Sequence, residues 1–193
     1  MVELTENQRG SVSNRLRIAA WATAGLILLL PLIAMQFTDE VNWSAADFIV
    51  FGAMLAGVGI AFELAIRKSG NHAYRAGFGI GLAAVFLLIW VNLAVGIIGS
   101  ETNDINMLYF GVIAVGIIGA IIATLKPSGM ALTMFAMAGA QGLIAAIALI
   151  GGLGAPATGP FEILWLNGFW VALFIVSALL FKKAASERFE ASD

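Results

Sequence analysis

The sequence predicts an all-α integral membrane protein, a bundle of six Gly/Ala-rich transmembrane helices with both termini in the cytoplasm. Of the 193 residues, 61% are hydrophobic and 11% are charged, whereas a soluble domain carries about 25% charged residues. The apolar residues gather in runs close to the roughly 20 residues that a helix needs to cross a bilayer. The basic residues all fall in segments on one side of these runs.

The apolar runs define the predicted spans, and none shows the period-two alternation of a barrel strand. They cover residues 18–37, 48–66, 77–98, 107–125, 130–150 and 162–181. Because no connecting segment is long enough to separate two domains, we predict one membrane domain over residues 15–183. Residues 1–14 and 184–193 are expected to be short disordered tails.

The distribution of basic residues sets the predicted orientation. Lys and Arg occur before the first span, between spans two and three, between spans four and five, and after span six. The opposite loops contain acids but neither Lys nor Arg. The positive-inside rule therefore predicts that both termini are cytoplasmic.

Local signals mark several helix ends. Ser44 and Asp47 have the spacing of a capping box that begins the second span. Pro160 suits the first position of the sixth. The sequence Lys126-Pro-Ser-Gly129 is typical of a tight turn, which predicts that spans four and five form a hairpin.

Aromatic side chains near the span ends predict a belt at the two membrane interfaces. By this reading Trp43, Tyr109 and Trp165 lie at the outer interface, and Trp21 and Tyr74 at the inner one. The recurring methionines of the fifth span are expected to fill packing space.

Small residues at helical spacing predict the faces where helices contact one another, because close packing replaces the hydrophobic effect between helices in lipid. The hexapeptide AVGIIG occurs twice, at 94–99 and 114–119. We interpret the two copies as similar packing surfaces of the third and fourth spans. The predicted packing glycines are Gly77, Gly81, Gly96, Gly99, Gly116 and Gly119.

Polar residues within the spans share faces with small residues or, for Asn167, with aromatic ones. Asn92 and Asn167 are expected in the outer third of the bilayer and Gln141 near its middle. Together with Glu101 they could line a polar cavity that opens outward. The alternative, which we favour, is hydrogen bonding between helices.

Apart from Glu162, at the first position of the sixth span, Glu63 is the one acidic or basic residue within a predicted span. Intramembrane acids often have a function, but Arg67 follows one helical turn later, in the favourable order for an ion pair. A structural ion pair is the preferred interpretation, and a role linked to protons or substrate is the alternative.

The remaining polar segments give weaker signals. The oxygen-rich loop 100–106 could bind a hard cation, but we prefer to read it as a cap for the fourth span. His72, the single histidine, lies in a basic loop that is typical of headgroup contact. No cofactor or metal site is predicted.

Membrane-embedded catalysis is not expected. The predicted spans lack the Ser with His or Lys, the paired Asp residues, and the His or Cys clusters that such enzymes use. The charge of −2 gives no reason to expect a nucleic-acid partner.

The stretch Trp90–Glu101, followed by Asn106–Phe110, resembles a family of small multi-pass bacterial inner-membrane proteins without a named function. The resemblance extends over about residues 90–125. It implies a bacterial inner membrane, and it implies no activity, cofactor or site residue.

Two functions fit these observations. The first is a non-catalytic membrane protein, either an accessory subunit or a homo-oligomeric scaffold, with the lipid bilayer and other membrane subunits as its partners. The second is a small permease or channel for a small solute or ion, with the outward polar cavity as its site.

Overall fold

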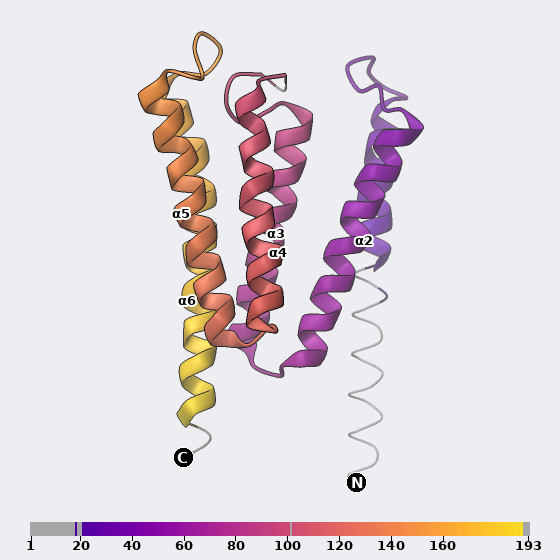
Figure 1. Ribbon diagram of the computed structural model, residues 1–193. Helices are drawn as coiled ribbons and strands as arrows, with labels where there is room; N and C mark the ends of the chain where they lie inside the picture. Colours follow the sequence, from indigo (N-terminus) through magenta and orange to yellow (C-terminus); the bar gives the residue numbers. More distant parts are fainter. Residues whose placement is uncertain (1–17, 19–20, 101, 191–193) are drawn as a thin grey trace. The chain divides into compact units, whose positions relative to one another are not determined.

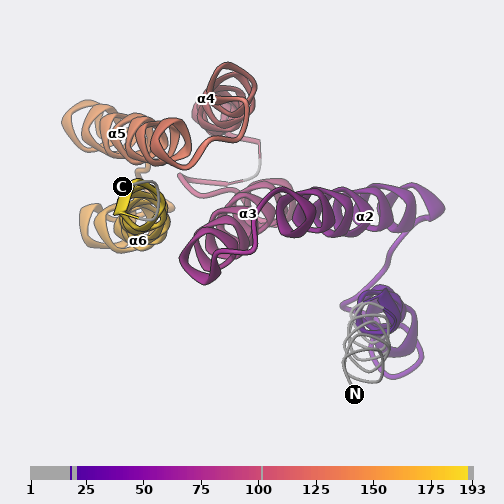
Figure 2. The same ribbon diagram turned by 90° about the horizontal axis from the view of Figure 1, so that it is seen from below.

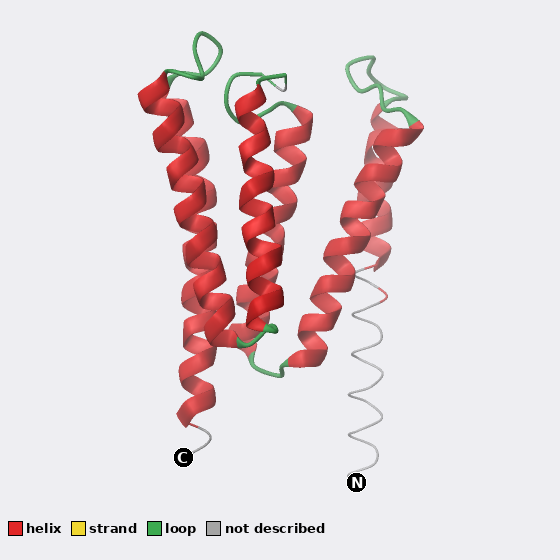
Figure 3. Cartoon of the chain, in the orientation of Figure 1, coloured by secondary structure: helices red, strands yellow, loops and turns green. Residues whose placement is uncertain are grey.

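The computed structural model describes residue 18, residues 21–100 and residues 102–190. Within these residues the regular secondary structure is helical, and no strand occurs (Figure 3). By contacts the chain divides into two compact units, residues 1–61 and residues 62–193.

Five helical segments in the described residues are long and apolar enough to cross a membrane. They are α2 (Ala45–Lys68), α3 (His72–Ala94), the 3-10 helix η1 (Asp104–Met107) with α4 (Leu108–Ala123), α5 (Pro127–Gly151) and α6 (Pro160–Glu190). The chain is therefore a multi-pass membrane protein. A shorter apolar helix, Trp21–Ala34, lies in the first predicted span. The total of six spans and the cytoplasmic termini stay predictions.

The first unit contains the helix Trp21–Ala34 and most of α2. The predicted capping box begins α2, since the Ser44 N–H donates to Asp47 Oδ2 at 2.7 Å and the Asp47 N–H donates to Ser44 Oγ at 3.4 Å. A β-carbon added at Gly59 would come within 2.9 Å of the Trp21 ring. Glycine therefore allows α2 to approach the shorter helix closely.

The second unit contains α3 to α6, which run alongside one another (Figure 1). α5 packs against both α4 and α6, and α6 also packs against α3. Figure 2 shows these neighbours in the view along the helices. α5 and α6 thus occupy the middle of the contact network.

The buried residues of α6 and α5 follow a repeating spacing of four and three positions. On α6 this spacing includes Ile163, Asn167, Trp170, Phe174, Ser177, Phe181 and Ala184, and Ala178 is buried beside them. On α5 the same spacing includes Met130, Met134, Met137, Gln141, Ile144 and Ala148. This spacing is typical of helices that pack along a seam at a small crossing angle. The methionines of α5 lie in the core, as expected.

Four of the predicted packing glycines lie at close helix contacts. A β-carbon at Gly77 would come within 3.2 Å of the Ser177 carbonyl oxygen of α6. On α4, a β-carbon at Gly116 would lie 2.8 Å from the Met137 sulfur, and one at Gly119 would lie 2.5 Å from Thr133 Cγ2. Gly81 faces Ser177 and Met134 in the same way.

Several helix ends differ from the predicted bounds. α3 ends at Ala94 instead of residue 98, because Gly96 adopts a left-handed φ of 73°. α5 begins at Pro127 instead of residue 130, since proline suits the first helical position. The predicted tail at 184–193 is helical as far as Glu190.

Burial and side-chain contacts stabilise the last turns of α6. Ala184 is buried, and Glu187 accepts a hydrogen bond of 2.7 Å from Asn71 Nδ2. Lys183 lies one turn before Glu187, at an N···O distance of 3.8 Å. The bond between Asn71 and Glu187 attaches the last turns of α6 to the turn between α2 and α3.

The close contact at Gly119 makes a prediction about stability. Gly119→Ala should lower the free energy of unfolding by about 1–3 kcal/mol, because the new methyl group overlaps the branched Thr133 side chain. SDS titration in mixed micelles, followed by circular dichroism, measures the change.

Gly111→Ala is the matched control on the same helix. A β-carbon at Gly111 meets no described atom within 4 Å, so this variant should be neutral or slightly stabilising. Equal loss of stability in both variants would contradict the packing role of Gly119.

Candidate functional site: a buried polar cluster

The amide of Asn167 joins three helices in the interior of the second unit. Its Oδ1 accepts from Tyr109 Oη of α4 at 2.9 Å and from Gln141 Nε2 of α5 at 3.0 Å. Its Nδ2 donates to the Ile163 carbonyl, one turn earlier on α6, at 2.9 Å. Because this last bond fixes the orientation of the amide, Oδ1 is directed towards both donors.

All three side chains of this cluster are excluded from solvent and lipid. Tyr109 and Gln141 are 0% exposed and Asn167 is 1% exposed. A hydrogen bond in such surroundings is stronger than in water, and an unpaired group is correspondingly costly. The cluster therefore favours one register of α4 and α5 against α6.

Two buried amide oxygens have no hydrogen-bond partner among the described residues. They are Gln141 Oε1 and Asn92 Oδ1. Both belong to side chains whose nitrogen donates, Gln141 to Asn167 and Asn92 to the Asn106 carbonyl at 3.2 Å. These oxygens are the acceptor sites that the interior still offers.

Two further bonds attach α6 to α3 along the same seam. Trp170 Nε1 donates to the Ala84 carbonyl at 3.2 Å, and Ser177 Oγ donates to the Gly77 carbonyl at 2.7 Å. In each bond the acceptor is the main-chain oxygen of a small residue, because a small side chain leaves the helix backbone accessible to a neighbouring helix.

A second polar centre, Asn106, holds the loop that follows α3. Its Oδ1 accepts from the N–H groups of Ile97 and Ile98 at 3.1 and 3.0 Å. Its Nδ2 donates to the carbonyls of Ile98 and Ser100 at 3.1 and 2.7 Å. One buried side chain thus supplies hydrogen bonds that a continuing helix would otherwise have made.

The interpretation of the first AVGIIG copy as part of the third span is wrong. Gly96 and Gly99 lie beyond α3 and have φ values of 73° and 76°. A β-carbon at Gly96 would come within 2.7 Å of Asn106 Nδ2. These glycines therefore permit a compact loop, and they are not helix-packing residues. The second copy lies within α4, as expected.

The structure brings together only part of the predicted cavity set. Gln141 and Asn167 are hydrogen-bonded to each other, whereas Asn92 bonds to the carbonyl of Asn106. Glu101 lies outside the described residues. The three amides form interhelical and loop contacts, and their arrangement resembles the hydrogen-bonding alternative more than a shared cavity lining.

Tyr109 and Tyr74 are buried among the helices, so these two side chains are not part of a lipid-facing belt, which corrects the belt prediction. Tyr109 is 0% exposed and bonds to Asn167, and Tyr74 is 1% exposed. The spacing of Tyr109 from the small residues of α4 indicates that its side chain is buried. Tyr109, Val112, Gly116 and Gly119 repeat at three and four positions along α4, so Tyr109 shares the packing face of the glycines.

Glu63 and Arg67 form the predicted ion pair, with an N···O distance of 3.1 Å. The Arg67 side chain is 67% exposed and the Glu63 side chain 24%. The pair has the ordinary geometry of charges one turn apart on a helix. A proton- or substrate-linked role for Glu63 stays a hypothesis.

The side chains of the polar loop before α4 form hydrogen bonds with other groups of the protein. Asn103 Oδ1 accepts from the Ile105 N–H at 3.2 Å and thereby caps η1. Asn103 Nδ2 donates to the Leu153 carbonyl at 3.0 Å, and Ser100 Oγ lies 2.9 Å from Thr102 Oγ1. Cation binding by this loop stays a hypothesis.

Chemically, the cluster consists of amides and one phenol. These groups donate and accept hydrogen bonds, but a side-chain amide does not ionise near neutral pH. The arrangement is suited to holding helices in register.

Comparisons with family models, curated proteins and solved structures found no match to this chain.

The shared acceptor predicts unequal effects of two substitutions. Tyr109→Phe removes one hydrogen bond without changing shape, and should cost about 1 kcal/mol of unfolding free energy. Asn167→Leu leaves the Tyr109 hydroxyl and the Gln141 amide without their acceptor, and should cost about 1–3 kcal/mol. The same SDS titration measures both. If Asn167→Leu were no more destabilising than Tyr109→Phe, Asn167 would not be the shared centre.

Proposed function

We propose that this chain is a non-catalytic membrane protein that acts as an accessory subunit or as a homo-oligomeric scaffold. The main support is that the buried polar groups form hydrogen bonds between helices. Tyr109, Gln141 and Asn167 bond to one another between helices, and Trp170 and Ser177 bond to the backbone of α3. Groups engaged in this way serve helix packing instead of substrate contact.

A second support is the outer face of α5. Ala136, Gly139 and Ala146 are exposed at helical spacing, with Leu143 between the last two. A β-carbon at Gly139 would meet no described atom within 4 Å. In lipid, small residues on an open helix face favour close approach of another helix. We assign this face to contact with a second copy or with another subunit.

Native mass spectrometry after gentle solubilisation tests the proposal. The wild-type chain should remain in a homo-oligomer or a larger complex. Gly139→Leu should shift the population towards the monomer, because the added side chain keeps the partner helix away from α5. A wild-type chain that is monomeric in several detergents and in nanodiscs would overturn the proposal.

Gly168→Leu is the matched control. Gly168 is also exposed and open, but its neighbours Leu164 and Trp165 on α6 are large and exposed. The complex should therefore survive this change. Equal dissociation by both variants would indicate a general effect of added bulk.

One observation favours the second candidate, a small permease or channel. Gln141 Oε1 and Asn92 Oδ1 are buried acceptors without a partner among the described residues, and a polar solute or an ion could use them. Flux into proteoliposomes that disappears in Gln141→Ala and Asn92→Ala would support transport. Flux equal to that of empty vesicles would reject it.

A further inference from the structure

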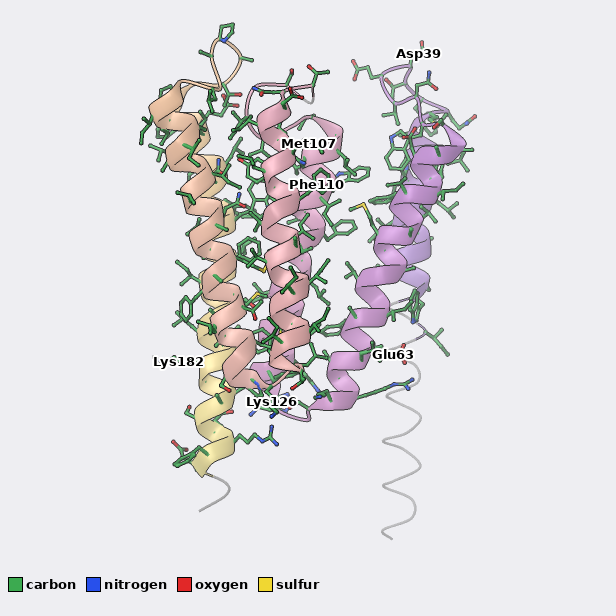
Figure 4. The ribbon with its side chains drawn as sticks, in the orientation of Figure 1. Asp39, Glu63, Met107, Phe110, Lys126 and Lys182 are labelled. Carbon is green, nitrogen blue, oxygen red and sulfur yellow. The ribbon has the colours of Figure 1, made fainter. Side chains whose placement is uncertain are left out.

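The second unit has a cleft of about 470 Å³ at one end. We call this end the basic end, because Lys68, Lys126 and Arg188 line the cleft there. Three segments that are distant in sequence form its walls: the turn between α2 and α3, the turn between α4 and α5, and the last turns of α6. Figure 4 shows Lys126 at the turn between α4 and α5, at the opposite end of α4 from Met107.

The cleft has an excess of positive charge. Three cationic side chains and one carboxylate, that of Glu187, line it. Glu187 already accepts from Asn71 Nδ2 at 2.7 Å, and Lys68 Nζ donates to the Thr124 carbonyl at 2.9 Å. Within the described part of the chain, the side chains of Lys126 and Arg188 have neither an ion pair nor a hydrogen bond.

The walls of the cleft are fixed by hydrogen bonds between the segments. Tyr74 Oη donates to the Leu125 carbonyl at 2.9 Å, which ties α3 to the turn between α4 and α5. Thr124 and Leu125 adopt left-handed φ values of 47° and 57° in that turn. Lys68 also bonds to this turn. The segments that carry the cationic side chains are therefore held together by hydrogen bonds before any ligand binds.

The start of α5, where Lys126 and Pro127 line the cleft, adds the positive end of a helix dipole to the same wall. Lys126 is the N-cap residue and makes no side-chain capping bond. The first N–H groups of an α-helix have no acceptors within the helix, and they favour an anion through the helix dipole. At α3, by contrast, Asn71 accepts from the Tyr74 N–H at 2.9 Å.

We propose that this cleft binds a phosphate group, carried either by the headgroup of an anionic phospholipid or by a soluble phosphate ester. Lys and Arg supply charge-assisted hydrogen bonds to phosphate oxygens. The volume lies within the usual range for small-ligand pockets. The cleft adjoins the last residue of α2 and the first residues of α5, where apolar helices end, so a headgroup can reach it.

Two binding measurements on the full-length protein test the proposal. In the first, native mass spectrometry counts adducts of phosphatidylglycerol and phosphatidic acid, with phosphatidylcholine as the neutral comparison. In the second, calorimetry measures glycerol 3-phosphate binding to the protein in phosphatidylcholine nanodiscs. Saturable binding of the anionic lipids alone assigns the site to a headgroup, and saturable binding of glycerol 3-phosphate assigns it to a soluble ester.

The double variant Lys126→Ala/Arg188→Ala should weaken this binding about 10- to 30-fold, from a typical contribution per basic group. Lys126→Arg/Arg188→Lys should retain it. All these side chains are exposed, so folding should be unaffected. Lys182→Ala is the matched control, because Lys182 is also exposed on α6 but does not line the cleft, and it should bind as the wild type does.

The proposal is overturned if neither measurement detects saturable binding. It is also overturned if Lys182→Ala weakens binding as much as the double variant, because the attraction would then be a general effect of surface charge. Neither outcome bears on the oligomeric state, so this proposal and the proposed function fail independently.

Discussion

The second unit depends on one acceptor, Asn167 Oδ1, which receives hydrogen bonds from α4 and α5 while belonging to α6. Between helices in lipid there is little hydrophobic attraction, so close packing and hydrogen bonds decide which faces meet. A single bond of this kind contributes about 1 kcal/mol, but a shared acceptor makes the two bonds depend on one side-chain position. The Ile163 carbonyl holds that position, and the registers of three helices follow from it.

Packing and hydrogen bonding use the same seams. On α6, Asn167 and Ser177 alternate with aromatic residues at spacings of three and four, and on α5 Gln141 occupies the equivalent series. Gly77 shows how the two effects combine. Its missing side chain lets α6 come close, and its carbonyl then accepts from Ser177 at 2.7 Å. A larger residue at this position would remove both the contact and the bond.

The sequence alone predicts much of this fold, because span length, small-residue spacing and capping are local. The buried face of α3 that leads from Gly77 to Asn92 follows from spacing, and so does the capping box at Ser44. The two AVGIIG copies show the limit. The first copy forms a loop after Ala94, whereas the second copy, at 114–119, is helical throughout, because Asn106 supplies hydrogen bonds to the first copy. Such a partner is visible only in three dimensions. The bond between Tyr109 and Asn167 is non-local in the same sense, although the spacing of Tyr109 from the glycines indicated its face.

Gln141 and Asn167, which are buried and hydrogen-bonded to each other, form a closed packing contact and not a water-filled path. The chain contains no cysteine, so a single introduced thiol can be labelled without background. The most direct measurement is the rate at which a membrane-impermeant, water-soluble thiol reagent labels Gln141→Cys in proteoliposomes. Asp104→Cys, at an exposed position, serves as the positive control, and labelling after SDS denaturation shows that the thiol is intact. We expect rapid labelling of Asp104→Cys and labelling of Gln141→Cys only after denaturation. Rapid labelling of folded Gln141→Cys would show that water reaches this position, and the packing contact would then not be closed.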